Sequence, residues 1–181
     1  GRRSCSLLWF PAAPRTEADM AKRRRTVLTD VAIGLGGILS DSSAHLPSPS
    51  DLSSEATARL QDAQCAAALS DWAGAAAHAA KLQRAAWAAL HAGHWSKVAP
   101  AWRAAYAAAC FHVAIGKCAV GEGDSSGERP SGSDGGRACA SLRALREVDL
   151  GLMLGDTTFR AALLRLAERI ERERAREEAP P

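Results

Sequence analysis

Histidine and cysteine are the residue types in this chain that could hold a metal or act as a nucleophile. A non-haem Fe(II) site of the two-histidine, one-carboxylate kind can take two of its ligands from a His-x-Asp/Glu pair. No histidine of this chain is followed two residues later by a carboxylate; the five are His45, His78, His91, His94 and His112. The sequence therefore predicts no iron site in this chain.

His91 and His94 stand three residues apart and could bind a metal together with a third ligand. They flank a glycine-containing corner with no acid or cysteine close in sequence. We therefore expect them to be partly exposed polar groups of that corner.

The cysteines form an odd set without a C-x-x-C pair: Cys5, Cys65, Cys110, Cys118 and Cys139. This pattern favours a reducing compartment, in which most of the thiols serve as small buried apolar groups. Cys110 has no base nearby in sequence, so we expect it to be structural and not a nucleophile.

Two further kinds of chemistry lack their motif. The run Gly34-Leu-Gly-Gly37 has neither the G-x-G-x-x-G spacing of dinucleotide sites nor the Gly-Lys-Ser/Thr of a P-loop, and no Gly-x-Ser-x-Gly occurs. The sequence thus predicts no catalytic, cofactor-binding or metal-binding residues, which leaves recognition by surfaces.

Residues 87–114 contain three of the five tryptophans and the only tyrosine of the chain. The pattern predicts the end of one helix, a corner at residues 91–96, and a second helix over residues 97–117. Pro100 falls in the first turn, where its missing N–H costs little. One face of the second helix is predicted to be apolar, with members Val98, Trp102, Ala105, Tyr106, Ala109 and Val113.

Four side chains in this stretch belong to types that carry binding energy at protein interfaces. They are Trp95, Trp102, Arg103 and Tyr106. As the alternative, they form the core of an alanine-rich helical domain. Arg103 falls off the apolar face, so it is the one expected to be exposed.

The surrounding pattern predicts further helices over residues 54–69, 72–90 and 137–154, and from 158 to about 178. Ser53 or Ser54 caps the first helix, and the corner at Ser70 and Asp71 caps the second. Apolar stripes follow helical spacing in the last three of these helices: Trp72, Ala75, Ala79, Leu82, Ala86 and Ala89; Leu142, Leu145, Val148 and Leu152; Phe159, Leu163, Leu166 and Ile170. We therefore predict an all-α fold of about five helices in consecutive antiparallel hairpins, similar to tetratricopeptide hairpins.

Composition divides the chain into three regions. Residues 1–51 read as a disordered or processed segment, residues 52–178 as a helical domain with a disordered insertion at 121–136, and residues 179–181 as a tail. The apolar run at 27–39 is too short to cross a membrane. A net charge of +3 does not by itself imply nucleic acid, and direct nucleic-acid binding is not expected.

A short basic run follows Met20. Lys22, Arg23, Arg24 and Arg25 could be recognised by a nuclear import receptor, or could form an ordinary solvated charge run. Both interpretations stay open on sequence alone.

Two blocks carry a resemblance to a known family. Residues 95–106, WSKVAPAWRAAY, continued at 108–110 and 112–114, closely resemble a segment in the N-terminal helical region of Jumonji-C oxygenases of the lysine-specific demethylase eight, or Jumonji domain protein five, family. The plant members are the most similar. The second block, DLGLMLG at 149–155, is similar to the Asp-x-Gly-Leu-x-x-Gly run of those proteins. The resemblance covers roughly residues 52–170 and does not include the catalytic half.

The resemblance implies an N-terminal protein-interaction or substrate-positioning domain of a histone demethylase or protein hydroxylase. The parent would use Fe(II) and 2-oxoglutarate, which this chain would not bind. It also implies a protein partner or the parent's own oxygenase domain, a nuclear location with the cytoplasm as a second site, and a role in chromatin and clock-linked gene regulation. The alternative is a stand-alone helical adaptor without catalysis, which differs in whether the reading frame continues past Pro181.

Overall fold

The computed structural model of the chain describes residues 52–94, 97–120 and 135–178. Within these ranges every element is a helix: α2 (Ser54–Ala68), α3 (Trp72–His91), α4 (Pro100–Val120), α5 (Gly135–Leu154) and α6 (Arg160–Glu178). The all-α prediction with five helices is confirmed. The predictions for residues 1–51, Trp95, positions 121–134 of the insertion and the tail at 179–181 lie outside the described residues.

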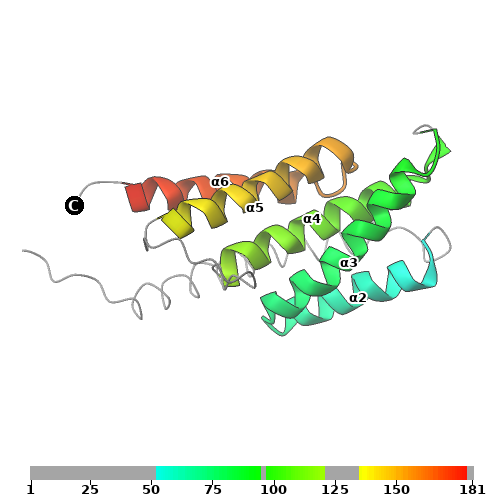
Figure 1. Cartoon of the computed structure of the whole chain (residues 1–181), viewed down its shortest axis with the longest axis horizontal. Coiled ribbons are helices and arrows are strands. Elements are labelled where there is room, and N and C mark those ends of the chain that lie inside the picture. The colour runs from blue at the N-terminus through cyan, green and yellow to red at the C-terminus, as the bar shows by residue number, and fades with distance from the viewer. Residues whose placement is uncertain (1–51, 95–96, 121–134, 179–181) are drawn as a thin grey trace, which may run out of the picture.

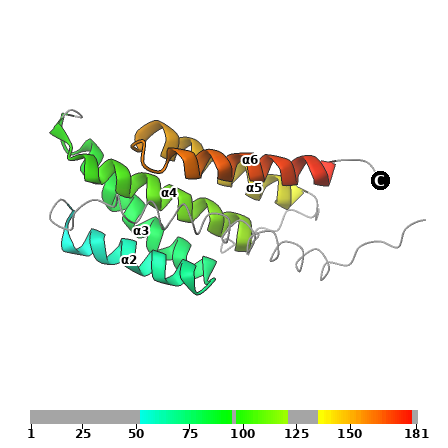
Figure 2. The ribbon, with the colours of Figure 1, turned by 180° about the vertical axis from the view of Figure 1, so that it is seen from behind.

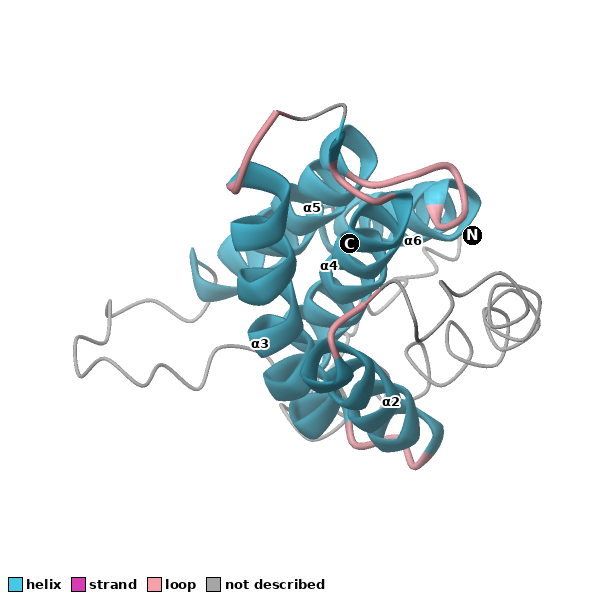
Figure 3. Cartoon of the chain, turned by 90° about the vertical axis from the view of Figure 1, so that its right-hand side faces the viewer, coloured by secondary structure: helices cyan, strands magenta, loops and turns pink. Residues whose placement is uncertain are grey.

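Helix α4 is the centre of the arrangement. It packs against α2 and α3 on one side and against α5 and α6 on the other, while each helix also packs against the next one along the chain. Figures 1 and 2 show the α2–α3 pair and the α5–α6 pair on opposite sides of α4, and Figure 3 shows α4 surrounded. The chain thus forms two three-helix units, α2–α3–α4 and α4–α5–α6, that share α4. None of the described helices is long and apolar enough to cross a membrane.

Local capping sets the first hairpin. The Ser53 hydroxyl accepts a hydrogen bond from the Ala56 N–H, and the Asp71 carboxylate accepts one from the Gly74 N–H at 2.9 Å. Between the helices, Ser70 adopts a positive φ of 59°, and the N–H groups of Ser70 and Asp71 bond back to the last carbonyls of α2. This is the Schellman arrangement, with serine where glycine is usual. The predicted corner and caps are confirmed.

Helix α4 begins three residues later than predicted. The Lys97 N–H bonds to the His94 carbonyl, and the Trp102 N–H bonds to the Ala99 carbonyl, so a separate turn precedes the helix. Pro100 has no N–H to donate and its φ is already helical, so it suits the first helical position of α4.

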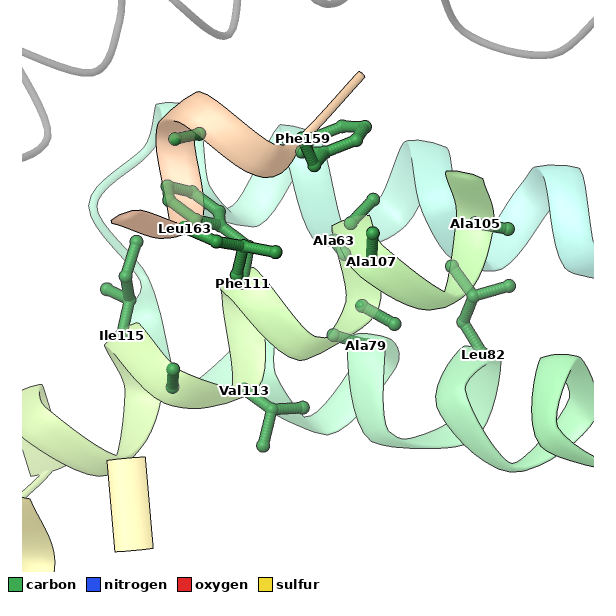
Figure 4. Close-up of a cluster of buried hydrophobic side chains, with 14 of the residues drawn as sticks. Ala63, Ala79, Leu82, Ala105, Ala107, Phe111, Val113, Ile115, Phe159 and Leu163 are labelled. Carbon is green, nitrogen blue, oxygen red and sulfur yellow. The ribbon is translucent and has the colours of Figure 1, made fainter. Parts of the chain in front are cut away.

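The prediction of a single apolar face on α4 was too narrow. Every residue from Ala104 to Gly116 is buried, on all sides of the helix. Figure 4 shows side chains of α4 meeting others from α2, α3 and α6: Ala105, Ala107, Phe111, Val113 and Ile115 beside Ala63, Ala79, Leu82, Phe159 and Leu163. The helix can be enclosed because so many of its side chains are methyl groups, which let four neighbours approach closely.

The predicted stripes of the outer helices fare differently. Phe159, which directly precedes α6, and Leu163, Leu166 and Ile170 within it are all buried, as predicted. In α5, Val148 is buried but Leu142 is largely exposed, and the buried face also takes Ala144 and Gly151. Helix α5 begins at Gly135, inside the predicted insertion and two residues before the predicted start.

Glycines mark where the helices come closest. A Cβ added at Gly116 would collide with the Ala76 methyl group and lie 3.1 Å from the Trp72 carbonyl oxygen, so α3 and α4 touch there. A Cβ at Gly151 would lie 3.0 Å from Cys110 Cβ, and one at Gly155 would collide with the Ala107 methyl group. The glycines of the DLGLMLG block therefore allow α5 to approach α4 closely.

Gly116→Ala tests the α3–α4 contact. Alanine favours an isolated helix, but here the added methyl group meets backbone and side-chain atoms that cannot both retreat. We expect the free energy of unfolding to fall by about 1–3 kcal/mol in urea denaturation. Gly93→Ala is the control, because a Cβ at Gly93 meets nothing within 4 Å and should change stability by less than about 0.5 kcal/mol. Equal effects of the two substitutions would contradict the close approach.

Candidate interaction surface

A network of polar side chains joins the three helices α3, α4 and α5. Lys117 Nζ lies 2.7 Å from Glu147 Oε1, and Gln83 Nε2 donates to Glu147 Oε2 at 2.6 Å. The same Gln83 amide nitrogen donates to Cys110 Sγ at 3.3 Å. The Glu147 side chain is only 12% exposed, so both of its oxygens have a partner where water is scarce. The network fixes the positions of α3 and α5 relative to each other, although both pack mainly on α4.

Burial removes any acid–base or nucleophilic role from the inner members of this network. Burial raises the pKa of the Cys110 thiol to about 11, and that of the Tyr106 hydroxyl also rises, chiefly through burial with Cys110 beside it. Both groups are therefore protonated at neutral pH, and a thiol is not a good nucleophile in that state. The expectation that Cys110 is structural agrees with this.

Aromatic rings gather at the end of α3 next to the α3–α4 corner. The ring of Trp87 lies 4.0 Å from that of His91 and 6.1 Å from that of Tyr106, measured between centroids. His91 Nδ1 is 2.8 Å from the Trp87 carbonyl oxygen, so the Nδ1–H donates to it. Trp87 remains 46% exposed. A large rigid ring is thus held in place by its neighbours while nearly half of it faces solvent.

Beneath Trp87 lies a small core of its own. Ala86, Tyr106 and Cys110 are buried there, and the half-buried side chains of Leu90, Trp102, Leu150 and Leu154 pack over them. We call the set of Trp87, Leu90, Trp102, Leu150 and Leu154 the aromatic end. Its members come from α3, from α4 and from α5, and each keeps part of its apolar surface in solvent.

The structure places the residues singled out by sequence in different environments. Trp102 and Arg103 are half-buried, and Arg103 is therefore less exposed than its position off the apolar face suggested. Tyr106 is buried at 2% exposure, so it belongs to the core alternative and supports the surface from below. Trp95 and the run Lys22, Arg23, Arg24 and Arg25 lie outside the described residues.

The sequence did not predict the polar network or the exposed tryptophan beside Tyr106. Gln83 and Glu147 stand 64 positions apart, and no local pattern links them. Trp87 could have been found, because it follows Ala86 of the buried α3 stripe and so lies at the border of that stripe.

His112 is the polar residue of the core that has no compensating partner. Its ring is 2% exposed and edge-on to Phe111, and neither ring nitrogen has a hydrogen-bond partner among the described residues. Burial lowers its pKa to about 4, so it is neutral at pH 7. Within the described part of the chain, no three His, Cys, Asp or Glu side chains are grouped so that they could hold a metal ion.

The first part of the helical domain is similar to a known protein family. Residues 50–127 match the family model described as KDM8-like, N-terminal ARM repeats. This part of the chain is similar to the N-terminal helical region of KDM8-like proteins. The matched residues include the whole of α2, α3 and α4, which is the first three-helix unit, and the description names armadillo-type repeats where the sequence suggested a likeness to tetratricopeptide hairpins.

A curated relative agrees with this assignment. The chain is 38% identical over 78 residues to lysine-specific demethylase JMJ30 of Arabidopsis thaliana. The match covers 43% of this chain but only 14% of that relative. No solved structure matches the chain significantly.

Removing Glu147 should weaken the network of α3, α4 and α5. Glu147→Ala leaves the Gln83 amide without its carboxylate acceptor in a half-buried site, and we expect a loss of about 1–3 kcal/mol in the free energy of unfolding. A double-mutant cycle with Lys117→Ala should give a coupling of about 1 kcal/mol. The matched control is the cycle for Arg172 and Glu168, which are 3.0 Å apart but 62% exposed each, and whose coupling should stay below about 0.5 kcal/mol. Couplings of equal size would contradict a special role for Glu147.

The buried imidazole makes stability depend on pH. Since the pKa of His112 is lower in the folded chain than in the unfolded chain, the unfolded state takes up the proton first. Stability is therefore full above about pH 6.5 and is lost as the pH falls towards 4, by about 2 kcal/mol between pH 8 and pH 5. In His112→Leu this part of the pH dependence should disappear, as measured by urea denaturation at both pH values. Val113→Ala is the control, because it removes buried apolar atoms next to His112 without removing a titratable group, and it should keep the parent's pH dependence.

Proposed function

We propose that this chain is the N-terminal protein-interaction or substrate-positioning domain of a Jumonji-C histone demethylase or protein hydroxylase. The observation that supports this best is the match of residues 50–127, and so of helices α2 to α4, with the KDM8-like N-terminal repeats. Repeat helices of this kind stack into extended surfaces that bind other chains. The proposed role of this domain is thus to present a binding surface to another chain or to the oxygenase domain of its parent.

The oxidation itself would belong to another part of the parent protein. There Fe(II) and 2-oxoglutarate would supply the chemistry of demethylation or hydroxylation. Among the described residues, no three His, Cys, Asp or Glu side chains are grouped so that they could hold a metal ion. What the described residues offer is a rigid helical body in which Glu147, Gln83 and Lys117 hold three helices in fixed positions.

The place of action would be the nucleus, and the process chromatin and clock-linked gene regulation. The relative JMJ30 is named as a lysine-specific demethylase, and this supports a nuclear role for the parent protein. The basic run from Lys22 to Arg25 would be the import signal. A second, cytoplasmic pool is compatible with the same role.

A chimera tests the proposed function. JMJ30 is prepared intact, with its matching segment deleted, and with that segment replaced by residues 52–178 of this chain. If the helical region positions the substrate or the oxygenase domain, the deletion should lower turnover of a methyl-lysine peptide at least tenfold, and the replacement should restore most of it. An unrelated helical repeat of equal length is the control insert and should not restore activity.

The outcomes separate the two candidate roles. A folded chimera as inactive as the deletion would contradict a positioning role. A reading frame that stops after Pro181 would favour the stand-alone adaptor, and one that continues into a His-x-Asp-containing domain would favour the oxygenase parent.

A further inference from the structure

The aromatic end has the features of a binding surface and not of an ordinary solvent-facing helix side. Its apolar side chains are large, and the small core beneath them has only three fully buried members. Trp87 is 46% exposed, and Met153, three residues after Leu150 on α5, is 77% exposed. Tryptophan is the residue type most enriched where interfaces are strongest. Large apolar side chains of α3, α4 and α5 thus come together here with part of their area in solvent.

The ring of Trp87 is also prepared for contact. Its stacking on His91 and its proximity to Tyr106 restrict its rotamers before any partner arrives. The hydrogen bond from His91 to the Trp87 carbonyl holds the last turn of α3 beneath it. A side chain that is already ordered loses little entropy when a partner covers it.

Among the described residues, the exposed charged side chains within one helical turn of the aromatic end are two arginines and one aspartate. Arg84 is exposed one helical turn before Trp87, and Arg146 is exposed one turn before Leu150. Arg103 follows Trp102 and is half-buried, with an interaction of its own. On the acidic side, Asp149 is exposed next to Leu150, while Glu147 is already paired with Lys117. A partner with acidic groups is therefore favoured by charge, and a lysine-rich tail is disfavoured.

We infer that the aromatic end is a docking surface for a short acidic peptide segment that carries two or three large apolar side chains. Apolar side chains of the segment would cover Trp87, Leu90, Trp102, Leu150 and Leu154, and its carboxylates would meet Arg84 and Arg146 on either side. This inference rests on the proposed function as an interaction domain and names the surface and the chemistry of the partner.

Three fluorescein-labelled helical peptides of equal length test this with the full 181-residue chain. The first has leucine at helical spacing and glutamate elsewhere, the second has lysine in place of glutamate, and the third has serine in place of leucine. Fluorescence anisotropy at 50 mM salt should give a Kd for the leucine–glutamate peptide at least tenfold lower than for either of the others. Raising the salt to 500 mM should weaken that binding several-fold.

Variants of the chain show where the peptide binds. Trp87→Ala should weaken binding of the leucine–glutamate peptide at least tenfold. The double variant Arg84→Glu with Arg146→Glu keeps every apolar side chain and should shift the preference to the lysine peptide. Leu69→Ser is the matched control, since Leu69 is 82% exposed at the opposite end of α3, and it should bind like the parent. Circular dichroism confirms that each variant is folded.

Other results would overturn the inference. These are no binding of the leucine–glutamate peptide, equal binding of all three peptides, a preference of the parent chain for the lysine peptide, and binding that Trp87→Ala leaves unchanged. A JMJ30 chimera that works alongside any such result would leave the proposed function standing and reject only this surface. Specific peptide binding with an inactive chimera would reject the positioning role and keep the surface.

Discussion

The enclosure of α4 is the constraint on which the rest of the structure depends. Four helices must reach one helix over only 21 residues, and every residue from Ala104 to Gly116 is buried as a result. Helix axes can come this close only where the side chains between them are small. The alanines of α4 and the glycines at 116, 151 and 155 are therefore requirements of packing. Because methyl groups bury little area each, stability comes from many close contacts, together with the larger Phe111, Phe159 and Leu163.

The same enclosure decides what happens to polar groups on α4. Tyr106 and Cys110 face the junction of α3 and α5, where the Gln83 amide, which also donates to Glu147, donates a hydrogen bond to Cys110. Lys117 lies nearer the helix end and is 36% exposed, so it can pair with Glu147 without full loss of water. His112 has no hydrogen-bond partner within the described part of the chain, and its burial keeps it neutral at pH 7. A polar residue is thus tolerated on the enclosed helix if it reaches a partner or can give up its charge.

Local features of the fold could be predicted from the sequence, and non-local ones could not. Ser53 and Asp71 cap helices through atoms three residues away, so the spacing in the sequence contains the whole interaction. The α6 stripe was also predicted correctly, because that helix is covered on one side and its other face is charged. Periodicity assigns one buried face to a helix. This prediction was therefore wrong for α4, because the middle of that helix has no exposed face. The prediction that Leu142 is buried was wrong for the opposite reason: its side chain lies at helical spacing, but no element covers it among the described residues.

The candidate surface was only partly predictable on similar grounds. Residue type predicted Trp102, Arg103 and Tyr106 as candidate surface residues, but residue type does not determine which side chains are exposed to solvent. Tyr106 proved to be a support, and the exposed ring belongs to Trp87 on the neighbouring helix. Finding that pair requires knowing how α3 crosses α4, which Gly116 and Ala76 decide.

The two blocks that carry the family resemblance consist largely of packing residues. In the second block, Gly151 and Gly155 seat α5 on α4, and in the first, Ala105 and Tyr106 lie in the interior. Similarity in these blocks therefore indicates a shared arrangement of helices and does not by itself indicate a shared partner. The charges that would select a partner, Arg84 and Arg146, stand outside both blocks on exposed turns of α3 and α5. Two proteins can thus share this body and bind different segments, because the fold and the recognition depend on different residues.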